Sequence, residues 1–197
     1  MVLAHGAGAG MQHPHMESLA SGLLKQSIAC FRYQFPFMEQ STRRPDTLPV
    51  AINCTLAAIE TAIRQHPNLP LFIGGHSFGG RIATHAAIDL DKPVSGLIGY
   101  SFPLHPAKKP SVKRAAHLNS IQLPMLFING DRDRLAETEL LEASRESLPN
   151  LNLHWLPGAD HSYKTTKRSG RSQEQTYLEA ASISRAFIDM HSSPTKT

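Results

Sequence analysis

The chain alternates short apolar runs with longer segments in which apolar residues recur every three or four positions. The short runs are typical of buried strands, and the longer segments are typical of amphipathic helices. The predicted strands cover residues 1–4, 28–35, 69–73, 94–100, 123–129 and 151–156. The predicted helices cover residues 15–27, 47–65, 78–90, 135–147 and 173–190. Strands that alternate with helices predict an α/β fold, in which a mostly parallel sheet is covered on both faces.

The same pattern indicates one domain. A chain of 197 residues lies within the usual size of a single domain, and neither an internal repeat nor a linker divides it. We expect the domain to cover residues 1–190, with residues 191–197 as a polar tail.

Composition narrows the cellular setting. No segment approaches the ~20 apolar residues of a membrane span, and the N-terminus lacks the basic and apolar regions of a signal peptide. The two cysteines, Cys30 and Cys54, are too few for a disulfide framework, so we expect a cytoplasmic protein. The net charge of +4 raises nucleic acid as a partner. Because no element interleaves clustered basic residues with exposed aromatic ones, we expect neither a nucleic-acid nor a membrane partner.

The most specific local motif is G-x-S-x-G, which runs from Gly75 to Gly79 between a predicted strand and a predicted helix. This is the context in which a serine nucleophile stands clear of a sheet in a sharp turn. The flanking glycines relieve crowding in such a turn, and the following helix directs its first N–H groups at a developing anion. The motif predicts Ser77 as a nucleophile, and the competing interpretation is an ordinary tight turn that contains a serine.

A nucleophilic serine needs a base and an orienting acid. Where the serine lies in such a strand-to-helix turn, the three residues follow one another along the chain in the order serine, acid, histidine. His161 follows a predicted strand and is our candidate base, whereas His154 falls within the strand. Asp131 and Asp133 both follow the strand before it and are both candidates for the acid. Asp131 directly follows Gly130, where it can bond its own turn, and Asp133 lies deeper in the loop. Asp160 adjoins His161 in sequence, an arrangement that usually directs the two side chains apart.

The glycine-rich segment from His5 to Gly10 follows the first predicted strand. It fits neither G-x-G-x-x-G nor a P-loop, because position 11 is Met11 and no lysine follows. We therefore expect an oxyanion hole, made by the backbone N–H groups of Ala7 and Phe78. Metal binding by His5, His13 and His15 is the alternative, but Glu17 is the only nearby acid, so we expect no metal and no cofactor.

Several stretches together resemble one known family. They are Leu3-Ala4-His5-Gly6-Ala7-Gly8-Ala9-Gly10, Tyr33-Gln34-Phe35-Pro36-Phe37 with Arg43-Arg44-Pro45, Gly74 to Arg81, Gly99 to Pro106, and Gly130 to Asp133. The chain resembles the small α/β-hydrolase-like proteins related to dienelactone hydrolase, a group that includes the hydrolase-like domain of a eukaryotic chromatin-complex subunit. The resemblance covers nearly the whole chain, and it is specific for the fold and not for a substrate.

The resemblance implies an α/β-hydrolase fold with Ser77 as nucleophile, Asp133 as acid and His161 as base. The chain departs from the group in two respects. Dienelactone hydrolases use a cysteine nucleophile where this chain has Ser77, and the fold usually has further strands before the one that begins here at Met1. With those N-terminal strands missing, we expect residues 28–35 to form an uncovered sheet edge, which favours a homodimer or a protective device.

We therefore expect a serine hydrolase of carboxylesterase type that acts on small esters, lactones or thioesters. The alternative is a non-catalytic interaction module on the same fold. No acid lies between Asp91 and Asp131, whereas five basic residues do, so we expect a positive active-site mouth and an anionic substrate. A basic face kept for solubility explains the same charges. The expected substrate-binding residues are Arg43, Arg44, His105 and Arg114.

Overall fold

The computed structural model describes residues 1–42, 44–88 and 90–192. Its strands are β1 (Val2–Ala4), β2 (Phe31–Tyr33), β3 (Leu71–His76), β4 (Val94–Tyr100), β5 (Met125–Gly130) and β6 (Leu151–Leu156). Its α-helices are α1 (Pro14–Lys25), α2 (Pro36–Glu39), α3 (Leu48–Gln65), α4 (Phe78–Ala86), α5 (Thr138–Glu146) and α6 (Gln173–His191). Two 3₁₀ helices, η1 (Lys113–Ser120) and η2 (Lys167–Ser169), complete the described elements.

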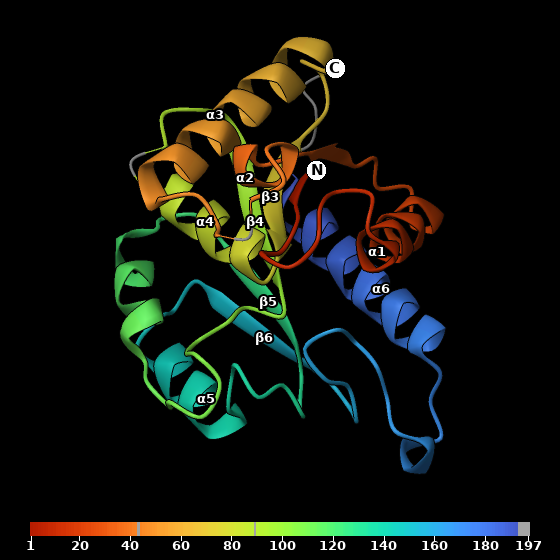
Figure 1. The fold of residues 1–197 in the computed structure, drawn as a ribbon. Helices are drawn as coiled ribbons and strands as arrows, with labels where there is room; N and C mark the ends of the chain where they lie inside the picture. The colour runs from red at the N-terminus through yellow and green to blue at the C-terminus, as the bar shows by residue number, and fades with distance from the viewer. Residues whose placement is uncertain (43, 89, 193–197) are drawn as a thin grey trace.

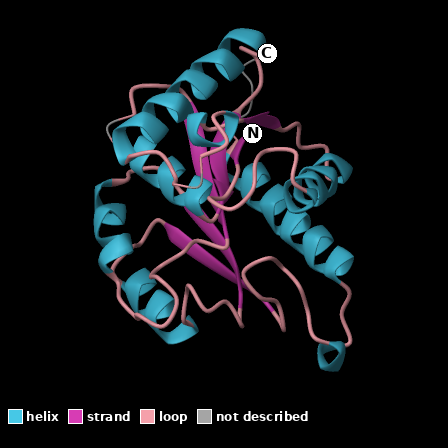
Figure 2. Cartoon of the chain, viewed as in Figure 1, coloured by secondary structure: helices cyan, strands magenta, loops and turns pink. Residues whose placement is uncertain are grey.

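The six strands form one sheet in the order β2-β1-β3-β4-β5-β6, and every neighbouring pair is parallel. In Figure 2 the strands lie between two groups of helices. The predicted parallel sheet of about six strands, with helices on both faces, is therefore confirmed. Strand β2 pairs with β1 and lies at an edge of the sheet, as expected for residues 28–35. The homodimer through that edge stays a prediction.

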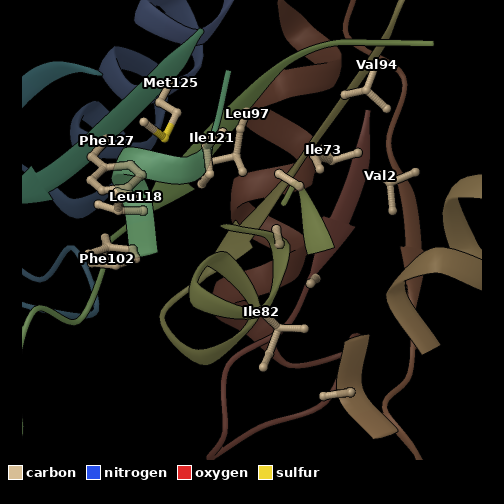
Figure 3. Packing of buried hydrophobic residues seen from close by; sticks show 14 of the residues in the cluster. Val2, Ile73, Ile82, Val94, Leu97, Phe102, Leu118, Ile121, Met125 and Phe127 are labelled. Atoms are coloured by element: carbon tan, nitrogen blue, oxygen red, sulfur yellow. The ribbon is translucent and has the colours of Figure 1, made fainter. Parts of the chain in front are cut away.

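Alternate strand residues supply two separate hydrophobic cores. Met125 and Phe127 of β5 join one core with residues of α3, α4 and α5. Leu126 and Ile128 of the same strand face the opposite core, which is completed by α1 and α6. Figure 1 shows α1 and α6 together on one side of the sheet and α3, α4 and α5 on the other side. Figure 3 shows the first core from close by, where Phe127 stacks on Phe102.

The structure departs from the expected elements mainly at their ends. Strand β2 has three residues instead of eight, and Pro36 begins the short helix α2 because a proline is compatible with the first turn of a helix. Helix α5 begins at Thr138 and not at residue 135, since the N–H of Leu135 donates to the Asp133 carboxylate in a turn. The long connection after β4 contains the unpredicted η1.

Among the described residues, no helix is long and apolar enough to cross a membrane. Of the predicted polar tail, Ser192 is described as the C-cap of α6, and residues 193–197 lie outside the described part of the chain.

Two glycines allow α4 to pack directly on the end of the sheet. A Cβ atom on Gly79 would lie 2.5 Å from the carbonyl oxygen of His5 and 2.7 Å from atoms of Ala4. A Cβ atom on Gly75 would lie 2.5 Å from the carbonyl oxygen of Ala4. Since real Cβ atoms do not approach backbone this closely, any larger side chain would push α4 away from the loop that follows β1.

We predict that Gly79→Ala destabilises the protein by about 1–3 kcal/mol, because overpacking outweighs the ~1 kcal/mol by which alanine favours a helix. Urea unfolding measures this loss. Gly8→Ala is the matched control, since a Cβ atom there meets nothing within 4 Å. Equal midpoints for the two variants would contradict this account of the packing.

Candidate active site

Ser77 connects β3 to α4 in a backbone conformation that serine rarely adopts, with φ 52° and ψ −115°. Two hydrogen bonds hold it there. Its N–H donates to the carbonyl of Tyr100 on β4 at 2.9 Å, and its carbonyl accepts from the N–H of Arg81 at 3.0 Å. The sharp turn places the side chain at the carboxyl end of the sheet, where ligands bind in open α/β folds.

His161 lies in the loop after β6, and its side chain contacts that of Ser77 at the carboxyl ends of the strands. Its Nε2 is 2.8 Å from the Ser77 hydroxyl oxygen, and its Nδ1 is 2.7 Å from an oxygen of Asp133. A carboxylate accepts, so a neutral imidazole here carries its proton on Nδ1, and Nε2 is left to accept from the serine hydroxyl. The His161 side chain is 25% exposed and the Asp133 side chain is fully buried. The ring is therefore reachable from solvent while its acid partner is sealed.

The three candidate aspartates have different hydrogen-bond partners. Asp133 bonds His161 through one oxygen and the N–H of Leu135 through the other, at 2.8 Å. Asp131 accepts the N–H of Gly158 at 2.8 Å, so its carboxylate joins two loops. Asp160 accepts the N–H groups of Ser162 and Lys164 within its own turn. Of the three, the structure brings Asp133 to the histidine.

The loop after β1 runs against Ser77. A Cβ atom on Gly6 would lie 3.6 Å from the Cβ of Ser77. The loop is held by His5, whose Nδ1–H donates to the carbonyl of Gly6 at 2.8 Å and whose Nε2 accepts the N–H of Phe35 at 3.0 Å. Burial lowers the pKa of His5, in keeping with this neutral form.

The N–H groups of Ala7 and Phe78, expected to form an oxyanion hole, belong to this loop and to the first residue of α4. Neither N–H makes a hydrogen bond to any residue in the described part of the chain. Both groups therefore keep a donor for a ligand, and their role stays a prediction.

Two further histidines lie next to His161. His76 is half-buried, and its Nε2–H donates to the backbone carbonyl of His161 at 3.0 Å. The ring of His15 lies 4.1 Å from that of His76, and its Nδ1 is 2.7 Å from the hydroxyl of Tyr177. Burial lowers the pKa of His76 well below its usual value and that of His15 to about 4, so both rings are neutral at pH 7.

The residues expected to bind substrate are spread more widely. Arg114 is half buried, and its guanidinium donates to the carbonyl of Pro103 at 3.4 Å. His105 is buried, with Nδ1 bonded to the carbonyl of Pro106 and Nε2 3.4 Å from the N–H of Glu137. Arg44 is exposed in the loop after α2, and Arg43 lies outside the described residues. The roles of all four stay predictions.

No metal-binding geometry accompanies this site. Within the described ranges, no group of three or more His, Cys, Asp or Glu side chains is arranged to hold a metal ion. A cavity of about 640 Å³ exists elsewhere, lined by Met1, Phe31, Leu71 and Pro93 among others. Those residues begin or precede their strands, whereas Ser77 follows the end of a strand. The cavity therefore lies at the amino-terminal ends of the strands, and Ser77 lies at their carboxyl-terminal ends.

The sequence does not indicate the contacts of three residues near the site. The pattern offers His5 only as a metal ligand, His76 occupies a variable position of its motif, and Arg81 has no predicted role. The signal for His5 was its place directly before Gly6 at a strand end. Nothing in the local sequence indicated that His76 would bond the loop of His161, since the two are 85 positions apart.

Comparison with known proteins identifies the class. The alpha/beta hydrolase domain family matches residues 1–189, and the chain therefore belongs to this family. Family membership identifies the chain as a hydrolase.

Three solved structures share its fold. An alpha-beta serine hydrolase homologue from Coxiella burnetii has a TM-score of 0.74 at 19% identity, covering 95% of this chain and 83% of that one. Dienelactone hydrolase from Anabaena variabilis has a TM-score of 0.73 at 16% identity, with coverages of 96% and 85%. A serine hydrolase without a lid from Xanthomonas campestris has a TM-score of 0.71 at 21% identity, with coverages of 94% and 82%. The predicted α/β-hydrolase fold and the resemblance to the dienelactone-hydrolase-like group are confirmed.

The buried neutral histidines predict a loss of stability in acid. The unfolded chain protonates His15 near pH 6.5, but the folded chain does so only near pH 4, because burial disfavours the charge. The contribution of His15 is therefore complete above pH 6.5 and is lost as the pH falls from 6.5 to about 4, by about 3 kcal/mol.

Urea unfolding at several pH values tests this linkage. His15→Gln should show a shallower decline than the wild type between pH 6.5 and 4. His66→Gln, at an exposed histidine, is the control and should follow the wild type. Parallel curves for His15→Gln and the wild type would show that His15 is not the group responsible.

Proposed function

We propose that the protein is a serine hydrolase of carboxylesterase type, with Ser77, His161 and Asp133 as its catalytic triad. The observation that carries the proposal is the continuous chain of hydrogen bonds from the Ser77 hydroxyl through both ring nitrogens of His161 to buried Asp133. Nucleophile, base and orienting acid need these contacts in this order. The strained serine between a strand and a helix matches the nucleophile elbow of the fold.

In the first step the Ser77 oxygen attacks the carbonyl carbon of an ester, and its proton passes to Nε2 of His161. The imidazolium that forms is stabilised by the Asp133 carboxylate on Nδ1. When the tetrahedral intermediate collapses, the carbon–oxygen bond to the alcohol breaks, and His161 returns the proton to the leaving oxygen. The acyl group is left on Ser77.

The negative charge of the intermediate requires donors that are already in place. The N–H of Phe78 is the first of α4, and that of Ala7 belongs to the loop that His5 fixes against the sheet. Preorganised backbone donors of this kind contribute about 2.7–4 kcal/mol each to transition-state stabilisation.

Water completes the cycle. His161 removes a proton from a water molecule, the resulting hydroxide attacks the acyl carbon, and Ser77 leaves with that proton restored. The products are a carboxylic acid and the free serine. Small esters, lactones and thioesters all carry a carbonyl that this sequence of steps cleaves, and they are the proposed substrates. The proposal also includes a cytoplasmic location.

We predict that Ser77→Ala abolishes labelling by a fluorophosphonate probe and hydrolysis of 4-nitrophenyl esters, while circular dichroism stays that of the wild type. Ser101→Ala is the matched control, because Ser101 also follows a strand with a positive φ of 51° but has no histidine partner in the described structure. It should keep both labelling and turnover.

The same experiment tests the alternative of a non-catalytic interaction module. A wild-type protein that is folded, takes up no probe and hydrolyses no ester of a broad panel would overturn the proposed function. Labelling that persists in Ser77→Ala would place the nucleophile elsewhere.

The two aspartates after β5 give a further prediction. Asp133→Asn should lower turnover by up to ~10⁴-fold, because the orienting acid is lost. Asp131→Asn should leave most turnover intact and lower the melting temperature, because the bond to Gly158 joins two loops. Steady-state kinetics and thermal denaturation of both variants separate the roles, and greater loss of turnover in Asp131→Asn would exchange the assignments.

A further inference from the structure

Half-buried arginines in the described part of this chain fall into two groups. Three of them form ion pairs with carboxylates: Arg32 with Glu17, Arg171 with Glu179 and Arg185 with Asp189. The other two, Arg81 and Arg114, have no carboxylate partner among the described residues. A guanidinium that is partly removed from water without an anion is unfavourable, so these two positions need an explanation.

Arg81 lies on α4 and Arg114 on η1, and these two elements contact each other, because Thr84 and His117, three residues after each arginine, are hydrogen-bonded at 2.8 Å. Burial lowers the pKa of both arginines, and the charge of Arg81 lowers that of Arg114 further. The Nε of Arg81 is buried and has no hydrogen-bond partner in the described structure. Arg114 uses one Nη on the carbonyl of Pro103. Donor groups of both side chains are therefore left for a ligand.

Both arginines are anchored near Ser77. Arg81 is one helical turn after it, and its N–H donates to the Ser77 carbonyl. Helical side chains lean toward the helix N-terminus, which directs Arg81 back toward the serine end of α4. Arg114 contacts Pro103, three residues beyond Tyr100, and the carbonyl of Tyr100 accepts the Ser77 N–H.

Side-chain contacts connect the helix that carries Arg81 to the one that carries Arg114. Thr84 is buried and donates to the carbonyl of Arg81 at 2.6 Å, so His117 donates from Nε2 to its hydroxyl oxygen at 2.8 Å. His85 stacks on His117 with 3.7 Å between ring centroids. Burial and the neighbouring positive charges hold the pKa of His117 at about 4, so it is neutral at pH 7. These contacts fix η1 against α4 and hold the two arginines in place.

We propose that Arg81 and Arg114 form an anion subsite that binds a second, ionised oxyanion group of the substrate, a carboxylate or a phosphate. The inference rests on the proposed function, since it makes the substrate an ester that carries its negative charge beside the scissile carbonyl at Ser77. Guanidinium groups fit this role because their planar fork matches carboxylate and phosphate oxygens. A basic face kept for solubility needs exposed charges, and these two are half buried.

A binding experiment tests the subsite without relying on turnover. In a Ser77→Ala background, NMR titration with butyrate and with inorganic phosphate should detect binding of at least one of them. Adding Arg81→Gln or Arg114→Gln should weaken that binding about ten- to hundredfold, the usual effect of losing a hydrogen bond to a charged group. Arg145→Gln, at an exposed arginine of α5, is the control, because it makes the same change in net charge.

Kinetics of the otherwise wild-type enzyme provide the second measurement. Arg81→Gln and Arg114→Gln should lower kcat/KM for 4-nitrophenyl hemisuccinate about ten- to hundredfold more than they lower it for neutral 4-nitrophenyl butyrate. Arg81→Lys should retain part of the preference, because it keeps the charge and loses the fork. If Arg81→Gln does not fold, Arg114→Gln decides the question.

The outcomes separate the two proposals. Binding of an anion that depends on Arg81 or Arg114, in a protein without esterase activity, supports the subsite and overturns the proposed function. Hydrolysis of both esters with Arg variants that match Arg145→Gln in binding and in kinetics supports the function and overturns the subsite.

Discussion

The backbone of Ser77 is the constraint on which the rest of the site depends. A serine at φ 52° and ψ −115° costs about 1–3 kcal/mol, and the surrounding structure must supply that energy. It does so through the hydrogen bond to Tyr100 on the neighbouring strand, the start of α4, and the direct packing of Gly75 and Gly79 on the β1 end of the sheet. Side chains at those glycines would separate α4 from the sheet and release the turn.

Two neutral histidines hold the loops of the site in place. His5 fixes the loop after β1, and His76 fixes the backbone of His161, each by a ring hydrogen bond to a carbonyl. Burial lowers the pKa of both, so neither takes a proton at neutral pH and their donor and acceptor roles stay constant. The hydrogen bonds that join Ser77, His161 and Asp133 are therefore bordered by histidine rings that stay neutral at pH 7. Because protonation of these rings is unfavourable, low pH is expected to destabilise the folded protein as well as to lower any activity.

Charge around the serine is arranged differently from charge elsewhere. Carboxylates pair with the half-buried arginines beside α1 and within or next to α6, whereas Arg81 and Arg114 have no carboxylate partner among the described residues. Desolvated positive groups attract an anion more strongly than exposed ones do. The family match identifies a hydrolase, and the proposed anion subsite at these two side chains would distinguish substrates by their charge.

The order of strands and helices was predictable from the sequence, because burial on both faces of a parallel sheet imposes apolar runs that local periodicity reveals. The sharp strand-to-helix turn at Ser77 was also predictable, because such a turn requires glycines at fixed positions around it. Local pattern alone left both Asp131 and Asp133 open, and only the family resemblance favoured Asp133. Both lie in one loop, and their partners, Gly158 and His161, come from a segment more than 25 positions away. The support by His76 and the pairing of Arg81 with Arg114 likewise join residues distant in the chain. The local pattern of apolar and polar residues indicates which face of a helix or strand is buried. It does not indicate which loops come into contact, because that depends on the order and register of all the strands in the sheet.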